Sequence, residues 1–168
     1  GYIVGSPALV DLDSDEDMEI VFTTQDGSNS GLLYAIHHDG ENVTGFPVDI
    51  NEKMLVGPAV GDLEGDELVD IVIATWEDKI YAVDNTGMIK SGFPYISTNR
   101  FNSPPTLADL DGDGDLEIIA GNDSGILHVL NHDGTEMTSF DTGDDIRGGI
   151  SVSDLDDDGS YEVLFTGY

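Results

Sequence analysis

The stretch Asp109-Leu-Asp-Gly-Asp-Gly-Asp-Leu-Glu117 carries carboxylates at its first, third, fifth, seventh and ninth positions. Gly112 and Gly114 separate some of them, and the apolar run Ile118–Ala120 follows at once. A hard cation such as calcium binds roughly six to eight oxygens at about 2.3–2.6 Å, which alternating carboxylates in a short loop can supply. The stretch therefore predicts a cation-binding loop that leads into a β-strand.

Three further copies of this loop occur along the chain. They begin at Asp11, Asp62 and Asp154, so that the first positions of successive loops are 51, 47 and 45 residues apart. Each loop leads into a short apolar segment of β-strand composition. These second-strand segments are Ile20–Phe22, Ile71–Ile73, Ile118–Ala120 and Val163–Phe165.

The first three units continue with another β-type segment, a glycine-containing hairpin turn and a fourth segment that carries a phenylalanine. The three phenylalanines, Phe46, Phe93 and Phe140, are each 47 residues apart. Units of about 40–50 residues with four short strands are typical of β-propeller blades. Because no window has a sustained 3.6-residue apolar period, the sequence predicts an all-β protein built from four-stranded antiparallel blades.

Residues 1–168 form a single repeat domain in this interpretation. Its blades cover about 2–50, 53–97 and 100–142, with a partial blade at 146–168. Propellers close with about four to eight blades, so three and a half blades do not complete a ring. We expect either a segment of a longer protein or several chains that complete the structure together.

The composition narrows the possible partners. The chain has 35 acidic residues against 5 Lys and Arg, a formal net charge of −30, which disfavours nucleic acid and anionic membrane surfaces. Hydrophobic residues make up 39% of the chain, enough for a packed core, and there is no cysteine. No run of about 18 apolar residues occurs, so no membrane insertion is expected.

The pattern Asp-x-Asp-x-Asp-Gly-x-x-Glu/Asp before an Ile/Val strand resembles the FG-GAP repeat of integrin α-subunit propellers. It is closer still to the related VCBS-type repeats of bacterial secreted proteins. The resemblance implies one Ca²⁺ per loop, up to four in all, held by side chains at positions 1, 3, 5 and 9 and by the backbone carbonyl of position 7. The implied ligands are Asp11, Asp13, Asp15, Asp17 and Glu19; Asp62, Glu64, Asp66, Leu68 and Asp70; Asp109, Asp111, Asp113, Asp115 and Glu117; and Asp154, Asp156, Asp158, Ser160 and Glu162.

The four loops depart from this pattern to different degrees. Position 6 is glycine in the third and fourth loops but Glu16 and Glu67 in the first two, where a left-handed backbone is costly. Glu64 is also longer than the usual aspartate. We therefore expect the tightest binding in the third and fourth loops and the weakest in the second.

Three alternatives to a calcium loop fit the sequence less well. An EF-hand needs a glutamate at position 12 between two helices, but position 12 of the third loop is Ala120 in an apolar segment. Magnesium is a weaker candidate because it retains waters and seldom takes an all-protein cage. Ordinary acidic turns without metal would explain one loop more readily than four phased copies.

The resemblance implies an extracellular calcium-binding module that acts as a scaffold or as an adhesion or protein-interaction domain, with calcium stiffening each blade. Calcium modules with Kd of ~10⁻⁴–10⁻³ M suit an extracellular or cell-surface location. The expected partners are a protein, a glycan or further copies of the chain. The alternative is an accessory, carbohydrate-binding domain of a secreted enzyme such as a polysaccharide lyase or peptidase.

The remaining chemistry-bearing residues are expected to be structural. No Gly-x-Ser-x-Gly, phosphate-binding loop or recurring catalytic pair occurs, so the chain is predicted not to be an enzyme. Trp76 is assigned a packing role at a blade edge, while Asn42 and Asn122 fit the N-glycosylation sequon. The four histidines are assigned surface or turn roles: His37, His38, His128 and His132.

Overall fold

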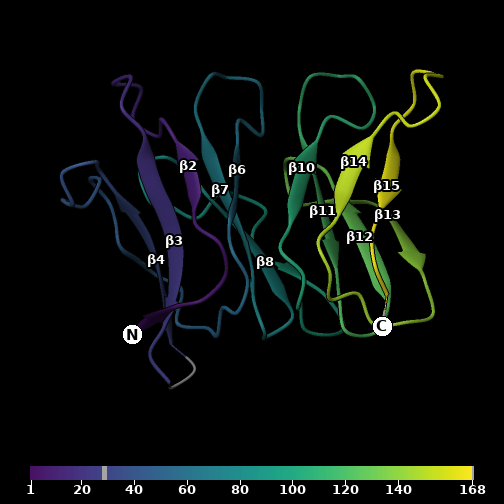
Figure 1. Ribbon diagram of the computed structural model, residues 1–168, viewed down its shortest axis with the longest axis horizontal. Helices are drawn as coiled ribbons and strands as arrows, with labels where there is room; N and C mark the ends of the chain where they lie inside the picture. Colours follow the sequence, from purple (N-terminus) through teal and green to yellow (C-terminus); the bar gives the residue numbers. More distant parts are fainter. Residues whose placement is uncertain (28–29, 168) are drawn as a thin grey trace.

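The described residues of the chain fold into β-strands and connecting loops, as the sequence predicted. A computed structural model describes residues 1–27 and 30–167. Within these residues the strands form three sheets with four strand positions each and a fourth sheet of two strands, standing side by side (Figure 1). The described part of the chain contains no helix long and apolar enough to cross a membrane.

Each sheet is built from strands that follow one another in sequence. The first contains β1 (Tyr2–Ile3), β2 (Ala8–Val10), β3 (Glu19–Gln25), β4 (Gly31–Ile36) and β5 (Val48–Asp49). The second contains β6 (Ala59–Gly61), β7 (Asp70–Ala74), β8 (Lys79–Val83) and β9 (Tyr95–Ile96). The third contains β10 (Thr106–Ala108), β11 (Glu117–Gly121), β12 (Ile126–Leu130) and β13 (Glu136–Asp141), and the fourth contains β14 (Ser151–Ser153) and β15 (Glu162–Leu164).

All neighbouring strands within a sheet are antiparallel. In the first sheet β1 and β2 both pair with β3, so together they occupy one strand position. Each acidic loop joins the first strand position of a sheet to the second, at β2–β3, β6–β7, β10–β11 and β14–β15. Because the four connections are equivalent, all four acidic loops emerge at the same end of the sheets, the upper end in Figure 1.

The sheets pack face to face through three apolar layers. Val21 and Leu33 of the first sheet pack with Ile71 and Ile73 of the second. Between the second and third sheets lie Val72, Ala74, Ile80, Ile118 and Leu130, and between the third and fourth lie Ile119, Val129, Val152 and Val163. Strands β7 and β11 are buried at every residue, because apolar side chains cover both of their faces.

The first sheet leaves one apolar face open. Strands β3 and β4 alternate between buried and half-buried residues, and the half-buried set includes Phe22 and Tyr34, whose rings stack with centroids 5.1 Å apart. The equivalent positions of the second sheet, Ile73 and Tyr81, are buried against the first sheet. The stack of sheets is therefore not closed on itself, and its first face has the side-chain pattern of an internal one.

Two glycines set the distance between adjacent units. Gly45 has φ of +97°, and a Cβ placed on it would lie 2.0 Å from the carbonyl oxygen of Thr86 in the next unit. Gly92 repeats the arrangement, with φ of +90° and 2.0 Å to the carbonyl oxygen of Asp133. Because any larger side chain would clash with backbone there, the Gly-Phe-Pro segments dock each unit onto the hairpin turn of the following one.

A buried polar network also joins the second and third sheets. His128 on β12 is only 5% exposed, so the surface or turn role predicted for it is wrong. Its Nδ1 lies 3.1 Å from the Tyr95 hydroxyl, and its Nε2 lies 3.0 Å from Ser97 Oγ and 3.2 Å from Asn122 Nδ2. The Tyr95 hydroxyl donates to Glu136 at 2.5 Å, which leaves its oxygen free to accept the Nδ1 proton of a neutral histidine.

We expect this network to make stability depend on pH near neutrality. Burial lowers the pKa of His128, against a smaller opposing effect of Glu136. The unfolded chain therefore takes up the proton first as the pH falls below about 6.5, and folding loses about 1.4 kcal/mol per unit of pKa depression. Denaturant unfolding in excess calcium at pH 7.5 and 5.5 should show a smaller pH difference for His128→Gln than for the wild type; an equal difference would contradict the role of His128.

Candidate metal centre

The four acidic loops share one hydrogen-bonding scheme, which begins at position 1. There the aspartate Oδ2 accepts the backbone N–H of position 6 in every loop, at 2.7–3.2 Å. Its Oδ1 accepts the N–H of position 5 in three loops and of Gly112, at position 4, in the third. The first aspartate thus folds the loop back over itself, as an Asx side chain does in a turn.

Positions 5 and 9 complete the scheme. The aspartate at position 5 accepts the N–H of position 7 at 2.8–2.9 Å in all four loops. The carboxylate at position 9 reaches back to the N–H of the leucine at position 2, at 2.7–3.3 Å. Because position 9 begins the next strand, this bond ties both ends of the loop together.

Positions 4 and 6 have a left-handed backbone in every loop. The third loop uses glycine at both places, with φ of 82° at Gly112 and 100° at Gly114. The first loop instead places Ser14 and Glu16 there, with φ of 64° and 73°, and the second has Glu67 at 69°. Non-glycine residues in this region cost about 1 kcal/mol or more each, so the third loop reaches the common conformation with the least strain.

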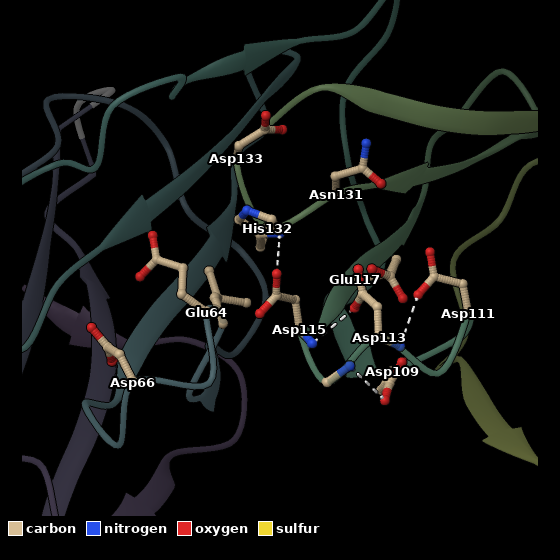
Figure 2. Close-up of polar contacts among 12 residues, drawn as sticks. Glu64, Asp66, Asp109, Asp111, Asp113, Asp115, Glu117, Asn131, His132 and Asp133 are labelled. Carbon is tan, nitrogen blue, oxygen red and sulfur yellow. Dashed lines mark hydrogen bonds and ion pairs between the residues drawn. The ribbon is translucent and has the colours of Figure 1, made fainter.

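Three of the loops bring acidic oxygens close together. In the third, oxygens of Asp109, Asp111 and Glu117 all lie within 4.8 Å of one another, and Figure 2 shows their side chains converging. The same positions of the fourth loop form an equivalent group. The group in the fourth loop consists of Asp154, Asp156 and Glu162. The first loop instead brings together positions 1, 3 and 5, which are Asp11, Asp13 and Asp15.

Repulsion within these groups is visible in the pKa values of their members. Burial, together with the charges of Asp111, Asp113 and Asp109, raises the pKa of Glu117. Burial and the neighbouring Asp15 and Glu19 likewise raise the pKa of Asp13. A cation placed among these oxygens would reverse that repulsion, because an opposite charge favours the ionised carboxylate.

The donor chemistry of the three groups fits calcium. Two oxygens that bind the same calcium at about 2.3–2.6 Å are no more than ~5 Å apart, and the acidic oxygens of each group lie within 4.8 Å of one another. All the donors in the third and fourth loops are carboxylate oxygens, as a hard cation prefers. Asp115, predicted to contribute its carbonyl, turns its side chain away to His132 at 3.1 Å (Figure 2).

The first loop has a neighbour that sequence reasoning did not assign to it. His37 Nδ1 lies 3.2 Å from Glu19 Oε1, and one nitrogen of His37 joins Asp13 and Glu19 in a second close group. The hydrogen bond to Glu19 raises the pKa of His37. His37 follows β4, and Glu19 begins β3, the strand that pairs with β4. The pairing of these two strands is the signal from which the contact between His37 and Glu19 could have been predicted.

The second loop differs from the other three. Within the described residues, its carboxylates do not form a close group of three. Instead, Lys90 Nζ contacts Glu64 Oε2 and lies 2.8 Å from Asp70 Oδ2. An ammonium therefore stands between positions 3 and 9, whereas in the third and fourth loops the oxygens of positions 3 and 9 lie within 4.8 Å of each other.

Two residues outside the loops have well-defined roles. Trp76, in the turn between β7 and β8, has Lys53 Nζ 4.7 Å and Arg100 Cζ 4.0 Å from its ring centroid, so it packs against two cations. Asn122 is fully buried and accepts backbone N–H groups from Ser124 and Ile126. A glycan cannot be attached at Asn122 in the folded protein, whereas Asn42 is exposed.

The sheets and their phased loops define a propeller-type repeat protein. Comparison with protein families agrees, because residues 62–120, which contain the second and third loops, match the FG-GAP-like repeat family. Residues 62–120 are thus similar to an FG-GAP-like repeat, and the resemblance predicted from the acidic loops is confirmed. No curated protein gives a significant match to the sequence.

Solved structures support the same fold. The Vibrio cholerae biofilm matrix protein Bap1 superposes with a TM-score of 0.75 and 25% identity over 98% of this chain, which spans 28% of the Bap1 chain. BamB from Moraxella catarrhalis matches 99% of this chain with a TM-score of 0.66 and 17% identity. BBS1N, in complex with ARL6DN, also matches 99% of this chain, with a TM-score of 0.67 and 14% identity. This chain spans 44% and 48% of those two chains, less than half in each case.

Proposed function

We propose that this chain is a non-catalytic, calcium-stiffened β-propeller module. The observation that carries the proposal is the convergence of carboxylate oxygens at positions 1, 3 and 9 of the third and fourth loops within 4.8 Å. Calcium there would link the strand before the loop to the strand after it. Its binding free energy would then add to the folding free energy, since the unfolded chain has no preformed site.

A scaffold role follows from where the loops lie. All four emerge at one end of the sheets, away from the apolar layers, so bound cations would fix the loop end without disturbing the core (Figure 1). The carboxylates that could imitate a catalytic pair already hold backbone N–H groups in the loop scheme. We therefore assign them to cation binding and loop structure rather than to acid–base chemistry.

An extracellular setting suits this module. Loops of this kind bind calcium with Kd of ~10⁻⁴–10⁻³ M, which requires the calcium concentrations found outside cells. Bap1, similar over 98% of this chain, is described as a biofilm matrix protein. The net charge of −30 would keep such a module soluble and away from anionic surfaces.

For a partner, we infer that the open face of the first sheet receives another four-stranded sheet of the same repeat. Ile20, Phe22 and Tyr34 on this face stand at the positions that Ile71, Ile73 and Tyr81 occupy at the buried interface between the first and second sheets. If a second copy supplies the sheet, sedimentation will show association that Tyr34→Glu abolishes. Sedimentation as a monomer at high concentration would exclude a second copy as the occupant.

Matched substitutions at position 5 test calcium binding in the loops. Asp113 and Asp66 each accept a backbone N–H at 2.9 Å, so Asp113→Ala and Asp66→Ala remove the same hydrogen bond. Asp113→Ala should also remove one calcium site, worth about 1.4–2.7 kcal/mol at 10 mM calcium for the Kd range above. Thermal melts should therefore show that Asp113→Ala loses more of the calcium-induced stabilisation than Asp66→Ala. Equal losses would contradict a calcium site in the third loop.

A further inference from the structure

The contact of Lys90 with the second loop differs from the other charged contacts near the loops, because one ammonium group pairs with two carboxylates of the same loop. Lys90 reaches two carboxylates of one loop at once, with Nζ against Glu64 Oε2 and 2.8 Å from Asp70 Oδ2. Asp70 is buried and the Lys90 side chain is 13% exposed, so the ammonium is largely withdrawn from solvent. An ammonium so placed is a compact positive charge with three donors.

The position of Lys90 in its unit is equivalent to an apolar position in the first unit. Its backbone N–H donates to the carbonyl of Ala82 at 2.9 Å, just as the N–H of Val43 donates to that of Ala35 at 3.0 Å. Val43 is buried in the apolar layer, and the residue 47 positions beyond Lys90 is Met137. The second unit thus carries a cation where its neighbours have an apolar side chain.

The ammonium and a calcium ion cannot share this place. Calcium would have to lie about 2.3–2.6 Å from the same oxygens that Lys90 now contacts, which would bring a +1 and a +2 charge into contact in a partly buried site. Expelling Lys90 would leave its charge without the two carboxylates that now compensate it. The second loop otherwise has the same backbone as the other three loops. It has left-handed residues at positions 4 and 6, and Asp62 and Asp66 accept the same backbone hydrogen bonds.

We propose that Lys90 serves as the built-in cation of the second loop, so that the chain binds three calcium ions rather than four. This inference rests on the calcium sites proposed above for the other loops. The second loop then keeps its shape at any calcium concentration. The second loop also contacts the third loop directly, through the hydrogen bond from the N–H of Leu116 to the carbonyl of Leu63 at 2.9 Å. The second loop, which needs no calcium, therefore supports the third loop, which does.

The test compares calcium stoichiometry, by isothermal titration calorimetry of the intact chain, for wild type and Lys90→Met. Methionine keeps the length of the side chain, removes the charge and matches Met137 of the third unit. We expect three ions for wild type and a fourth for Lys90→Met. Lys79→Met is the matched control, because Lys79 pairs with Glu52 outside the loops, and it should leave the count at three.

A second readout covers the case in which the variant binds weakly. Without calcium, Lys90→Met leaves the carboxylates of the second loop unpaired, so its melting temperature in chelator should fall by ~5 °C or more. Four ions on wild type would overturn the role of Lys90, as would the same count for wild type and Lys90→Met together with an unchanged melting temperature in chelator. A wild type that binds no calcium at all would instead contradict the proposed calcium function, so the two failures are distinguishable.

Discussion

Removing calcium with a chelator is expected to lower the melting temperature of this protein by ~10 °C or more. At 10 mM calcium, a loop with Kd of ~10⁻⁴–10⁻³ M is stabilised by about 1.4–2.7 kcal/mol. Three such loops contribute roughly 4–8 kcal/mol, and each 1 kcal/mol moves the melting temperature of a domain of this size by about 2–4 °C. Because whole domains are stable by only about 5–15 kcal/mol, the loss is large.

The measurement is a thermal melt followed by circular dichroism, before and after chelation and again after calcium is restored. Sodium chloride at matched ionic strength is the control, because a chain of net charge −30 also gains from simple screening. Magnesium should stabilise less than calcium, since it retains waters. A melting temperature that responds equally to calcium and to matched ionic strength would contradict stabilisation by bound calcium.

Truncating Phe101 is the second change expected to have a large effect. Phe101 is 1% exposed, belongs to the apolar layer between the second and third sheets, and donates its backbone N–H to the carbonyl of Thr75 at 3.1 Å. Its ring centroid lies 5.8 Å from that of His128. Removing such a ring costs about 3–5 kcal/mol, so Phe101→Ala should lower the melting temperature by roughly 6–20 °C.

Phe140→Ala is the matched control, since it removes the same atoms from a side chain that is 64% exposed. Chemical denaturation of both variants in calcium should give a large loss for Phe101→Ala and a change within about 0.5 kcal/mol for Phe140→Ala. Similar losses for the two would mean that the layer between the second and third sheets does not carry the stability assigned to it.

The strand order and the loops could be predicted because their signals are local. An acidic nonapeptide followed by β-branched residues specifies a turn and a strand through neighbours in sequence, and four phased copies reveal the unit. The left-handed backbone expected at position 6 is present in all four loops, at Glu16 and Glu67 as well as at the glycines. Local propensity is overridden at these glutamates because their backbone N–H groups donate to Asp11 and Asp62, and these hydrogen bonds close the loop.

Contacts between residues far apart in the sequence could not be predicted in the same way. Lys90 reaches Glu64 across 26 residues, and nothing in the local sequence around either residue indicates the pair. His128 was assigned a surface or turn role because no further metal ligand stands at a useful spacing from it, yet the packing of the third sheet on the second buries it among Tyr95, Ser97 and Asn122. Phe140 keeps the 47-residue phase of Phe46 but lies exposed on β13, because phase alone does not specify which neighbour covers a side chain.

The central claim is that the acidic loops bind calcium, and isothermal titration of calcium into the chelator-treated chain tests it most directly. The account predicts saturable binding of three ions per chain, with Kd of ~10⁻⁴–10⁻³ M, and loss of one ion when Asp111 in the third loop is replaced by alanine. Heats that do not saturate, or a count that Asp111→Ala leaves unchanged, would contradict it.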